Sequence, residues 1–487
     1  MYTSTRSHLE YSDPSAVLTG IAPDGGLFVD PDVRSRDFDV SSCIGLEYTA
    51  ISEKVMSHLL PGFGSRMHEI VSVYPGKFSR SEITPLAKIG DDFCLELYYG
   101  PTLAFKDVAL SVLPLFITAA KDIEGITETI SILTATSGDT GKAALEGFHD
   151  VPGTDITVFF PHGGVSAMQR LQMVTQAGAN VRVAAVEGNF DDCQRGVKEA
   201  FARFASLSPS ERGGRILSSA NSINIGRLVP QVAYYFSAYS QLVSRGEAAF
   251  GEEVDFVVPT GNFGDILAGL LAKYMGLPVG RLVCASNSNS VLYDFLSTGV
   301  YDKRRPFIKT VSPSMDILVS SNLERLLFYA SEGDCELVSS LMAQLGKDGV
   351  YTLSGSPFAA IKDLFSAGWC SEAETAETIG RMWRDYGYLC DTHTAVAISV
   401  MSKYKAAEGR GRKCIALSTA SPFKFPSTVL SAIGGTPSDD EFETAMRLSE
   451  LTGVACPEAI TGLKAKPVLH STVIPVDEVV PFSLSTF

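Results

Sequence analysis

The sequence predicts an α/β protein of open, mostly parallel sheets with flanking helices, preceded by a small N-terminal α/β region. From about residue 90 onward, short runs of apolar and β-branched residues alternate with stretches of helical character. A turn rich in glycine or small polar residues follows most of the apolar runs. Because strands that alternate with helices pair in parallel, this rhythm indicates helices on both faces of each sheet. The chain has 487 residues, too many for one ordinary core, so two or three domains are expected.

The region before the core carries signals for a turn, a strand and a helix. Residues 22–27 (Ala-Pro-Asp-Gly-Gly-Leu) predict a turn that leads into a short strand. Tyr48, Ile51, Val55 and Leu59 then fall at helical spacing, and Pro61 ends that helix. We therefore predict a separate N-terminal domain over residues 1–88.

The core strands end in turns that can carry chemistry. In chain order the predicted strands are residues 131–136, 157–160, 181–186, 254–259, 281–285 and 414–417. Ligands of parallel sheets bind at the carboxyl ends of the strands, so we expect one composite site there. The predicted core spans residues 89–430 as two α/β lobes with a mostly helical insertion around 312–406, and a C-terminal extension covers 431–487.

Composition excludes several classes of function. The formal net charge is −15, which argues against a nucleic-acid surface or an anionic membrane as partner. The nine cysteines include no CxxC pair, so a reduced compartment is expected and a structural zinc site is not. The first residues do not resemble a signal or transit peptide, and the longest nearly apolar run, residues 108–120, is too short to cross a bilayer. We expect a cytoplasmic protein without a metal.

Lys106 is the main candidate for a reactive side chain. A turn built on Gly100 and Pro101 precedes it, and a mostly apolar segment follows. Most lysines are solvated surface residues, and that alternative applies here too. An amine at the entrance of an apolar segment would have a depressed pKa, however, and could act as a nucleophile.

Two turns at predicted strand ends are candidates for binding anions. Residues 260–265 (Thr-Gly-Asn-Phe-Gly-Asp) lie between a strand and a helix, where backbone N–H groups can hold a phosphate. An ordinary tight turn explains that pattern equally well. Residues 137–141 (Ser-Gly-Asp-Thr-Gly) offer hydroxyls and a carboxylate, although the same residue types also serve as helix N-caps.

Further candidates lie later in the chain. Arg227 follows a run of Asn and Ser at a predicted helix start and suits a phosphate or carboxylate, unless it is a surface arginine. Thr419 follows a predicted buried strand, and a hydroxyl at the end of such a strand can form a hydrogen bond with a ligand. Lys142 and Lys424 are either anion contacts or surface residues, and we interpret His393 as a structural residue.

As a set, these motifs resemble the threonine synthases, which are pyridoxal-phosphate enzymes of fold type II. Residues 96–107 run E-L-Y-Y-G-P-T-L-A-F-K-D, close to the lysine motif of that family. The S-T-R of residues 4–6, the A-P-D-G-G-L of residues 22–27 and the S-P-S-M-D-I of residues 312–317 also resemble it. The resemblance runs from Tyr2 to about Pro426, with departures at Tyr99, where the family commonly has His, and at Ile225, where it has an aromatic residue.

The resemblance implies a cofactor site and an adjoining substrate site. Lys106 would bind pyridoxal 5'-phosphate covalently, the 261–265 turn would hold its phosphate, and Thr419 would meet its pyridine nitrogen. The implied cofactor-binding residues are Lys106, Gly261, Asn262, Phe263, Gly264, Asp265, Thr419 and Asp139. The implied substrate-binding residues are Ser137, Thr140, Asn221, Ser222, Asn224 and Arg227.

The activity implied by the resemblance is the conversion of O-phospho-L-homoserine and water to L-threonine and phosphate. One alternative is a related phospholyase that releases 2-oxobutyrate, and another is a catalytically silent homologue. Retention of Lys106, the 261–265 turn and Thr419 argues against the silent homologue. We expect a monomer or homodimer whose partner is this small-molecule substrate.

Overall fold

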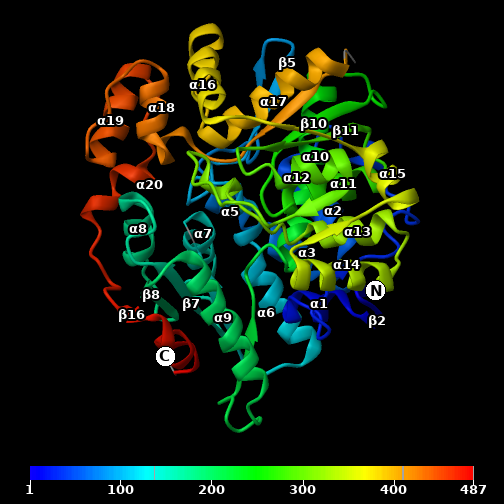
Figure 1. Cartoon of the computed structure of the whole chain (residues 1–487), viewed down its shortest axis with the longest axis vertical. Coiled ribbons are helices and arrows are strands. Elements are labelled where there is room, and N and C mark those ends of the chain that lie inside the picture. The colour runs from blue at the N-terminus through cyan, green and yellow to red at the C-terminus, as the bar shows by residue number, and fades with distance from the viewer. Residues whose placement is uncertain (137, 409–410, 486–487) are drawn as a thin grey trace.

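Two mostly parallel sheets organise the computed structural model, which describes residues 1–136, 138–408 and 411–485 (Figure 1). The six-stranded sheet has the order β14-β11-β10-β15-β5-β4, and only the β4–β5 pair is antiparallel. Its strands are β4 (Leu86–Ile89), β5 (Asp92–Glu96), β10 (Val254–Pro259), β11 (Val279–Ser286), β14 (Phe365–Trp369) and β15 (Cys414–Ser418). The five-stranded sheet, of order β16-β8-β7-β6-β9, is parallel throughout. Its strands are β6 (Thr129–Ala135), β7 (Thr154–Pro161), β8 (Val181–Glu187), β9 (Arg215–Ser218) and β16 (Val473–Pro475). The predicted α/β class with open, mostly parallel sheets is confirmed.

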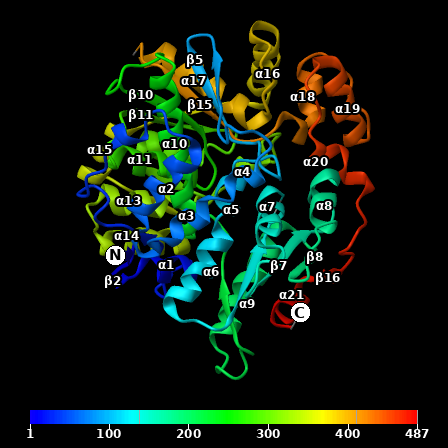
Figure 2. The same cartoon turned by 180° about the vertical axis from the view of Figure 1, so that it is seen from behind.

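Helices cover both sheets and connect their strands. Around the five-stranded sheet lie α7 (Asp139–Phe148), α8 (Ala167–Val174), α9 (Phe190–Ala205) and the C-terminal α21 (Val479–Leu484). The C-terminal segment, red in both views, runs along the edge of this sheet, and β16 pairs with β8 (Figure 2). The other helices of the two lobes are α5 (Lys106–Leu110), α6 (Leu113–Glu124), α10 (Ile225–Ser244), α11 (Gly264–Tyr274), α12 (Val291–Thr298), α13 (Leu323–Ala330), α14 (Cys335–Asp348), α15 (Gly355–Leu364), α16 (Glu372–Tyr386), α17 (Thr392–Glu408), α18 (Pro426–Ala432), α19 (Glu441–Thr452) and α20 (Glu458–Thr461).

The N-terminal region forms a small antiparallel sheet and a helical layer. The sheet consists of β1 (Tyr2–Ser4), β2 (Ser7–Tyr11) and β3 (Phe28–Val29), and the helices are α1 (Asp13–Thr19), α2 (Tyr48–Leu59), α3 (Arg66–Val71) and α4 (Tyr74–Lys77). The predicted turn before a short strand and the helix that stops before Pro61 are both present. The side chains of this region are part of the same apolar core as α10 and α11, and α2 packs against α10 while α1 packs against α6.

Some boundaries differ from those expected. The boundary predicted at residue 88 falls inside β4, which pairs with β5 in the core sheet. The 312–406 region is mostly helical but also supplies β14, which pairs with β11, and β13 (Val350–Thr352), which pairs with β12 (Val300–Asp302). The region therefore completes the edge of the core sheet as well as covering it. Among the helices of the described ranges, none is long and apolar enough to cross a membrane.

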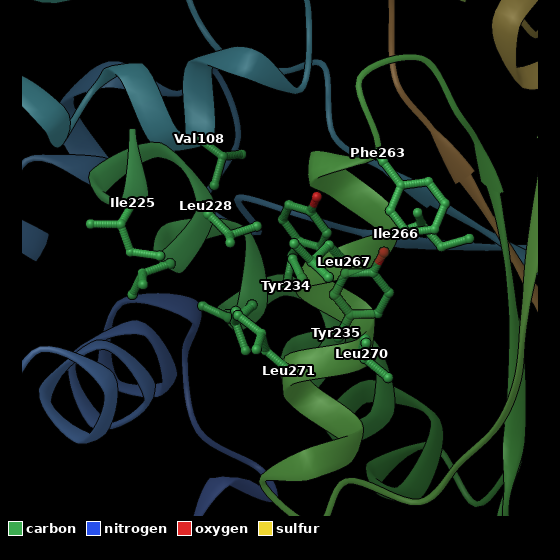
Figure 3. Close-up of a cluster of buried hydrophobic side chains, with 14 of the residues drawn as sticks. Val108, Ile225, Leu228, Tyr234, Tyr235, Phe263, Ile266, Leu267, Leu270 and Leu271 are labelled. Atoms are coloured by element: carbon green, nitrogen blue, oxygen red, sulfur yellow. The ribbon is translucent and has the colours of Figure 1, made fainter. Parts of the chain in front are cut away.

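Helix α10 packs against α11 within the apolar core. Figure 3 shows Tyr234 and Tyr235 of α10 directed toward α11, whose Leu267 and Leu270 lie beside them. Close approach of the two helices depends on Gly269, because a Cβ there would lie 2.8 Å from both Tyr235 Cε1 and Leu282 Cδ2. Contacts this short cannot be relieved by a flexible side-chain end, since a buried ring and a core leucine make them.

Replacing Gly269 by alanine should destabilise the protein by about 1–3 kcal/mol, because the added methyl overpacks the core. Gly346→Ala is the matched control, since Gly346 lies in α14 with no atom within 4 Å of an added Cβ. That control should leave stability unchanged or raise it by about 0.5–1 kcal/mol through better helix propensity. Thermal unfolding of both variants measures this, and an unchanged melting temperature for Gly269→Ala would contradict the packing described here.

Candidate active site

Lys106 lies at the start of α5, where two loops of the six-stranded lobe are joined. The Phe105 N–H donates to Thr419 O at 2.8 Å, and the Ser421 N–H donates to Leu103 O at 3.0 Å. These bonds tie the segment after β5 to the segment after β15, which is the neighbouring strand of the sheet. The Lys106 side chain is thereby held beside the end of β15 and is only 11% exposed.

The Lys106 amine is surrounded by charged and polar groups. Its Nζ is 3.4 Å from Ser314 Oγ and 3.8 Å from Asp139 Oδ2. Burial lowers the pKa of Lys106 to about 8, and the positive charges of Lys424 and Arg227 act in the same direction, while Asp139 opposes them. A substantial fraction of the amine is therefore neutral, and able to act as a nucleophile, near pH 8.

Asp139 and Lys424 form a buried ion pair next to this amine. Lys424 Nζ lies 2.6 Å from Asp139 Oδ1 and also donates to Thr102 O at 2.9 Å. Burial alone would raise the pKa of Asp139, but Lys424 and Lys106 together hold it well below its usual range. The structure thus excludes the surface alternative for Lys424, whose side chain is 1% exposed.

The 260–265 turn presents unpaired backbone N–H groups at the start of α11. Within the described residues, no acceptor is bonded to the N–H groups of Gly261, Asn262, Phe263 and Gly264. The carbonyls on the other side of the turn are occupied: Ser320 Oγ donates to Gly261 O at 2.9 Å, and the Asn322 backbone N–H and Nδ2 both donate to Asn262 O at 3.0 Å. We call residues 261–264 the N–H cup. Donors that converge at a helix N-terminus suit a phosphate.

The shape of the cup depends on two unusual backbone positions. Gly261 admits no side chain, because a Cβ would lie 2.6 Å from Ser314 O. Phe263 has a φ of 63°, an uncommon conformation for a bulky residue. Its ring is buried and lies 5.6 Å from the Phe365 ring, centre to centre, and this packing holds the conformation. Figure 3 shows Phe263 beside Ile266 at the start of α11.

Asp265 faces α10. Its Oδ1 accepts hydrogen bonds from the Tyr234 hydroxyl and, at 3.2 Å, from the Tyr235 hydroxyl, while its buried Oδ2 has no partner in the described part of the chain. Burial raises the pKa of Asp265 to about 7. The side chain therefore anchors α11 to α10, and its predicted contact with the cofactor stays a prediction.

Thr419 and Thr140 each carry a hydroxyl that forms no hydrogen bond with a described residue. Thr419 is buried and its carbonyl accepts from Phe105, but no described residue bonds its hydroxyl. Thr140 lies in the first turn of α7, whose N-cap residue is Gly138. The Thr136 Oγ1 supports this turn by accepting from the Gly138 and Gly141 N–H groups at 3.0 and 2.9 Å. Ser137, a predicted substrate-binding residue, lies outside the described residues.

Residues 221–227, a loop that leads into the first turn of α10, contribute an arginine. Arg227 is buried, donates to Ala220 O at 2.9 Å, and makes no ion pair with a carboxylate of the described chain. Its Nε is buried and has no partner among the residues that the structure describes, and burial lowers the pKa of Arg227 to about 10. Ser222 lies beside the N–H cup, since its Cβ is 3.8 Å from a Cβ built on Gly264. Asn221 and Ser222 are partly exposed and no described group bonds their side chains.

The Asn224 side chain bonds the protein backbone, unlike the side chains of Asn221 and Ser222. It caps α10 by accepting from the Gly226 N–H at 2.8 Å, and its Nδ2 donates to Val17 O and Ser219 O, both at 3.0 Å. It is completely buried and joins the loop to α1. These contacts do not favour the substrate role predicted for Asn224.

Lys142 lies apart from the amine cluster. It is buried and bonds Glu146 at 3.0 Å and Gln176. Neither alternative considered for it, an anion contact or a solvated residue, matches this pairing. Its partners lie one helical turn away and on a distant segment, so its burial was not visible in the local pattern.

Sequence reasoning missed Ser314 as a site residue. It lies in the short 3-10 helix Pro313–Met315, and its Oγ is 3.4 Å from both Lys106 Nζ and Asp139 Oδ2. The Ser314 N–H donates to His393 Nε2 at 3.1 Å, and His393 Nδ1 lies 2.7 Å from Asp391 Oδ2. His393 Nε2 is therefore an acceptor, which fits the structural role predicted for that histidine. The only signal for Ser314 was its place in the S-P-S-M-D-I stretch.

Comparison with known proteins identifies the family. A model described as "Pyridoxal-phosphate dependent enzyme" matches residues 83–419, and models of the threonine synthase N-terminus and C-terminal region match residues 1–66 and 394–474. A threonine synthase of Pseudomonas aeruginosa is 39% identical over 444 residues, which cover 90% of this chain and 91% of that protein. The chain belongs to the threonine synthase family.

Members of the threonine synthase family also match in structure. The pyridoxal-phosphate-bound threonine synthase of Brucella melitensis superposes with a TM-score of 0.87 at 36% identity, over 99% of this chain and 98% of that one. The yeast threonine synthase gives a TM-score of 0.86 at 33% identity, covering 99% and 97%. Human threonine synthase-like 1 is 39% identical and covers 86% of this chain, which spans 57% of that longer protein.

The chain is accordingly an enzyme that depends on pyridoxal phosphate, and its residues fit that group. A buried amine with a depressed pKa, a cup of unpaired N–H groups and a free hydroxyl at the end of β15 match the aldehyde, phosphate and ring nitrogen of the cofactor. A Cβ on Gly261 would disturb the cup, which accounts for glycine at that position.

Replacing Lys424 by methionine should raise the pKa of the Lys106 amine by about one unit. The change removes a positive charge near Lys106 and leaves the Asp139 carboxylate to interact with Lys106 alone. In cofactor-free protein, the rate at which an amine-reactive reagent labels Lys106 should rise with pH to a midpoint near 8, and the variant should shift that midpoint upward. Mass spectrometry of the labelled peptide measures it.

Lys142→Met provides the matched control, because Lys142 is also a buried lysine but pairs with Glu146. It should leave the midpoint for Lys106 in place. An unchanged midpoint in Lys424→Met would show that the ion pair does not set the reactivity of the amine.

Proposed function

We propose that this protein is a threonine synthase that converts O-phospho-L-homoserine and water to L-threonine and phosphate by β,γ-replacement. The proposal is supported by two neighbouring groups of donors near the Lys106 amine. One is the N–H cup, and the other is the buried Arg227 in the segment that also contains Asn221 and Ser222. A cofactor phosphate and a substrate phosphate need two such groups.

The local charge of the site supports an anionic substrate. Lys106, Lys424 and Arg227 gather there in a protein whose formal net charge is −15. Lys424 is neutralised by Asp139, whereas Arg227 pairs with no carboxylate of the described chain. A buried guanidinium with an unpartnered Nε is suited to a charge-assisted hydrogen bond with phosphate.

The mechanism follows from where the protein places its proton-binding groups. When bound, the cofactor supplies the electron sink that makes protons on the substrate's Cα and Cβ acidic. The Lys106 amine, whose pKa is about 8, can accept and return a proton at those carbons near neutral pH. Ser314 Oγ lies within reach of Lys106 Nζ and Asp139 Oδ2 and holds the amine in place. Arg227 retains the phosphate as it leaves the γ-carbon.

A related phospholyase that releases 2-oxobutyrate is the second candidate, because it would use the same Lys106 amine and the same phosphate-binding groups. Tyr99, the residue that departs from the family pattern, does not distinguish the two activities. Its hydroxyl donates to Glu96 Oε2 at 2.7 Å, and the Arg80 guanidinium lies 4.2 Å from its ring centre. These contacts engage Tyr99 with Glu96 and Arg80, and none involves Lys106.

The products identify the reaction. Purified protein incubated with pyridoxal phosphate and O-phospho-L-homoserine should give threonine and phosphate in equal amounts by ¹H and ³¹P NMR. 2-Oxobutyrate with phosphate would assign a phospholyase instead. Absence of phosphate release from protein that binds the cofactor would overturn the substrate assignment.

The same assay on Arg227→Met tests the proposed phosphate site. Loss of a charged hydrogen bond to phosphate should lower kcat/KM at least about 100-fold while the absorbance of the bound cofactor is retained. Arg195→Met is the control, since Arg195 is an exposed residue of α9 that pairs with Asp192. Equal activities in the two variants would contradict the role given to Arg227.

A further inference from the structure

Arg325 is a completely buried arginine behind the N–H cup. It lies in the first turn of α13 and is among the largest fully buried side chains of the protein. Its neighbour Glu324 is engaged elsewhere, by Arg6 and Thr5 of the N-terminal region. In the described chain no carboxylate pairs with Arg325, and all three nitrogens of its guanidinium instead donate to oxygens of uncharged groups. Burying the charge of Arg325 without a carboxylate costs folding free energy, so the contacts that this arginine makes call for an explanation.

The three acceptors of Arg325 belong to three different segments. Nε donates to Phe28 O of β3 at 2.8 Å, and Nη2 donates to Ile223 O at 2.6 Å. Nη1 donates to Asn322 Oδ1. One side chain therefore connects the N-terminal sheet, the loop that contains Asn221 and Ser222, and the segment that supports the N–H cup.

The bond to Asn322 fixes the orientation of an amide. A guanidinium only donates, so the oxygen of the Asn322 amide must face Arg325. The amide nitrogen then faces Asn262 O, to which it donates at 3.0 Å. This bond holds the Asn262 carbonyl on the far side of the turn and leaves the N–H groups of the cup directed toward the site.

The two loops that Arg325 supports are also neighbours. Ser222 lies against Gly264 of the cup, with its Cβ 3.8 Å from a Cβ built on that glycine. Ile223, whose carbonyl accepts a hydrogen bond from Arg325, directly follows Ser222 in the sequence. A displacement of the guanidinium would therefore move both anion sites relative to each other.

We propose that Arg325 is a positioning residue that aligns the N–H cup, for the cofactor phosphate, with the loop that contains Asn221 and Ser222, for the substrate phosphate. It acts on the cup through Asn322 and on the loop through the carbonyl of Ile223. The cup half of this proposal concerns the cofactor alone. The loop half rests on the proposed function, because it assigns that loop to the substrate phosphate. Arg325 also connects both loops to the N-terminal region, because its Nε donates to Phe28 O. The N-terminal region thereby has a role in the site.

Asn322→Asp tests the link to the cup without a change in size. The aspartate can still pair with Arg325, but it presents an acceptor to Asn262 O in place of a donor. The measurement is the affinity for pyridoxal 5'-phosphate and for pyridoxal, which lacks the phosphate, followed by the absorbance of bound cofactor. The preference for the phosphorylated form should fall at least tenfold in the variant, while the affinity for pyridoxal changes less than threefold.

Arg325→Lys tests the link to both loops. It keeps the positive charge but cannot reach three acceptors in fixed directions. The preference for the phosphorylated cofactor should fall at least tenfold. At saturating cofactor, the KM for O-phospho-L-homoserine should rise at least tenfold with kcat within threefold, whereas Asn322→Asp should leave that KM within threefold.

Arg34→Met is the matched control. Arg34 also joins the N-terminal region to α13, by donating to Tyr329 O at 3.1 Å, but it contacts neither loop. It should change neither the phosphate preference nor the KM.

Equal losses of pyridoxal and pyridoxal phosphate binding in Asn322→Asp and Arg325→Lys would reduce both residues to structural supports and overturn the proposal. So would an unchanged phosphate preference in both variants. If the unaltered protein does not turn over O-phospho-L-homoserine, the proposed function fails, yet the phosphate preference still tests the link to the cup. Asn322→Asp keeps that test available if Arg325→Lys does not fold.

Discussion

The burial of the Lys106 amine is the constraint on which the rest of the site depends. Removing an amine from water lowers its pKa, and this makes the neutral, reactive form available near neutral pH. Asp139 alone would oppose that effect by stabilising the ammonium form. Lys424 pairs with Asp139 at 2.6 Å and reduces this opposition. The ion pair thus allows a carboxylate to lie beside the amine without holding it entirely in the ammonium form.

The site is assembled from loops that follow strands of both sheets. The six-stranded sheet contributes the loops after β5, β10 and β15, which carry Lys106, the N–H cup and Thr419. The five-stranded sheet contributes the loop after β6, which leads to Asp139. Because parallel strands bring their carboxyl ends to one edge, residues far apart in sequence meet without any special local structure. The buried Arg325 then joins the N–H cup and the 221–227 loop to the N-terminal region.

Features that depend on local pattern were predictable from the sequence. The strand predicted at residues 254–259 coincides with β10, and the helix expected from Tyr48 to Leu59 coincides with α2, because apolar runs and periodic spacing are local signals. β14 was missed: its Ser-Ala-Gly centre has no strong β-branched character, and its pairing with β11 sets its conformation. The sequence alone also indicated Lys106 and the 260–265 turn as candidates, although it left ordinary alternatives open.

Features that depend on distant partners were not predictable. Lys424 and Lys142 are buried because Asp139 and Glu146 compensate them, and a sequence pattern does not reveal such pairing. Asn224 carries the residue type of an anion contact but is used to cap α10 and hold α1. Ser314, Asn322 and Arg325 contact segments far away in the chain, so the local sequence does not reveal what these side chains bond, even though Ser314 lies in the S-P-S-M-D-I stretch.

The most direct test of this account asks which lysine binds the cofactor covalently. Two buried lysines, Lys106 and Lys424, lie next to Asp139, and the account assigns the reactive amine to Lys106 because Lys424 is held by an ion pair and by Thr102 O. Reduction of the pyridoxal-phosphate-loaded protein with borohydride, followed by peptide mass spectrometry, locates the fixed cofactor. The account predicts a single pyridoxyl adduct on Lys106, and an adduct on Lys424, or none at Lys106, would contradict it.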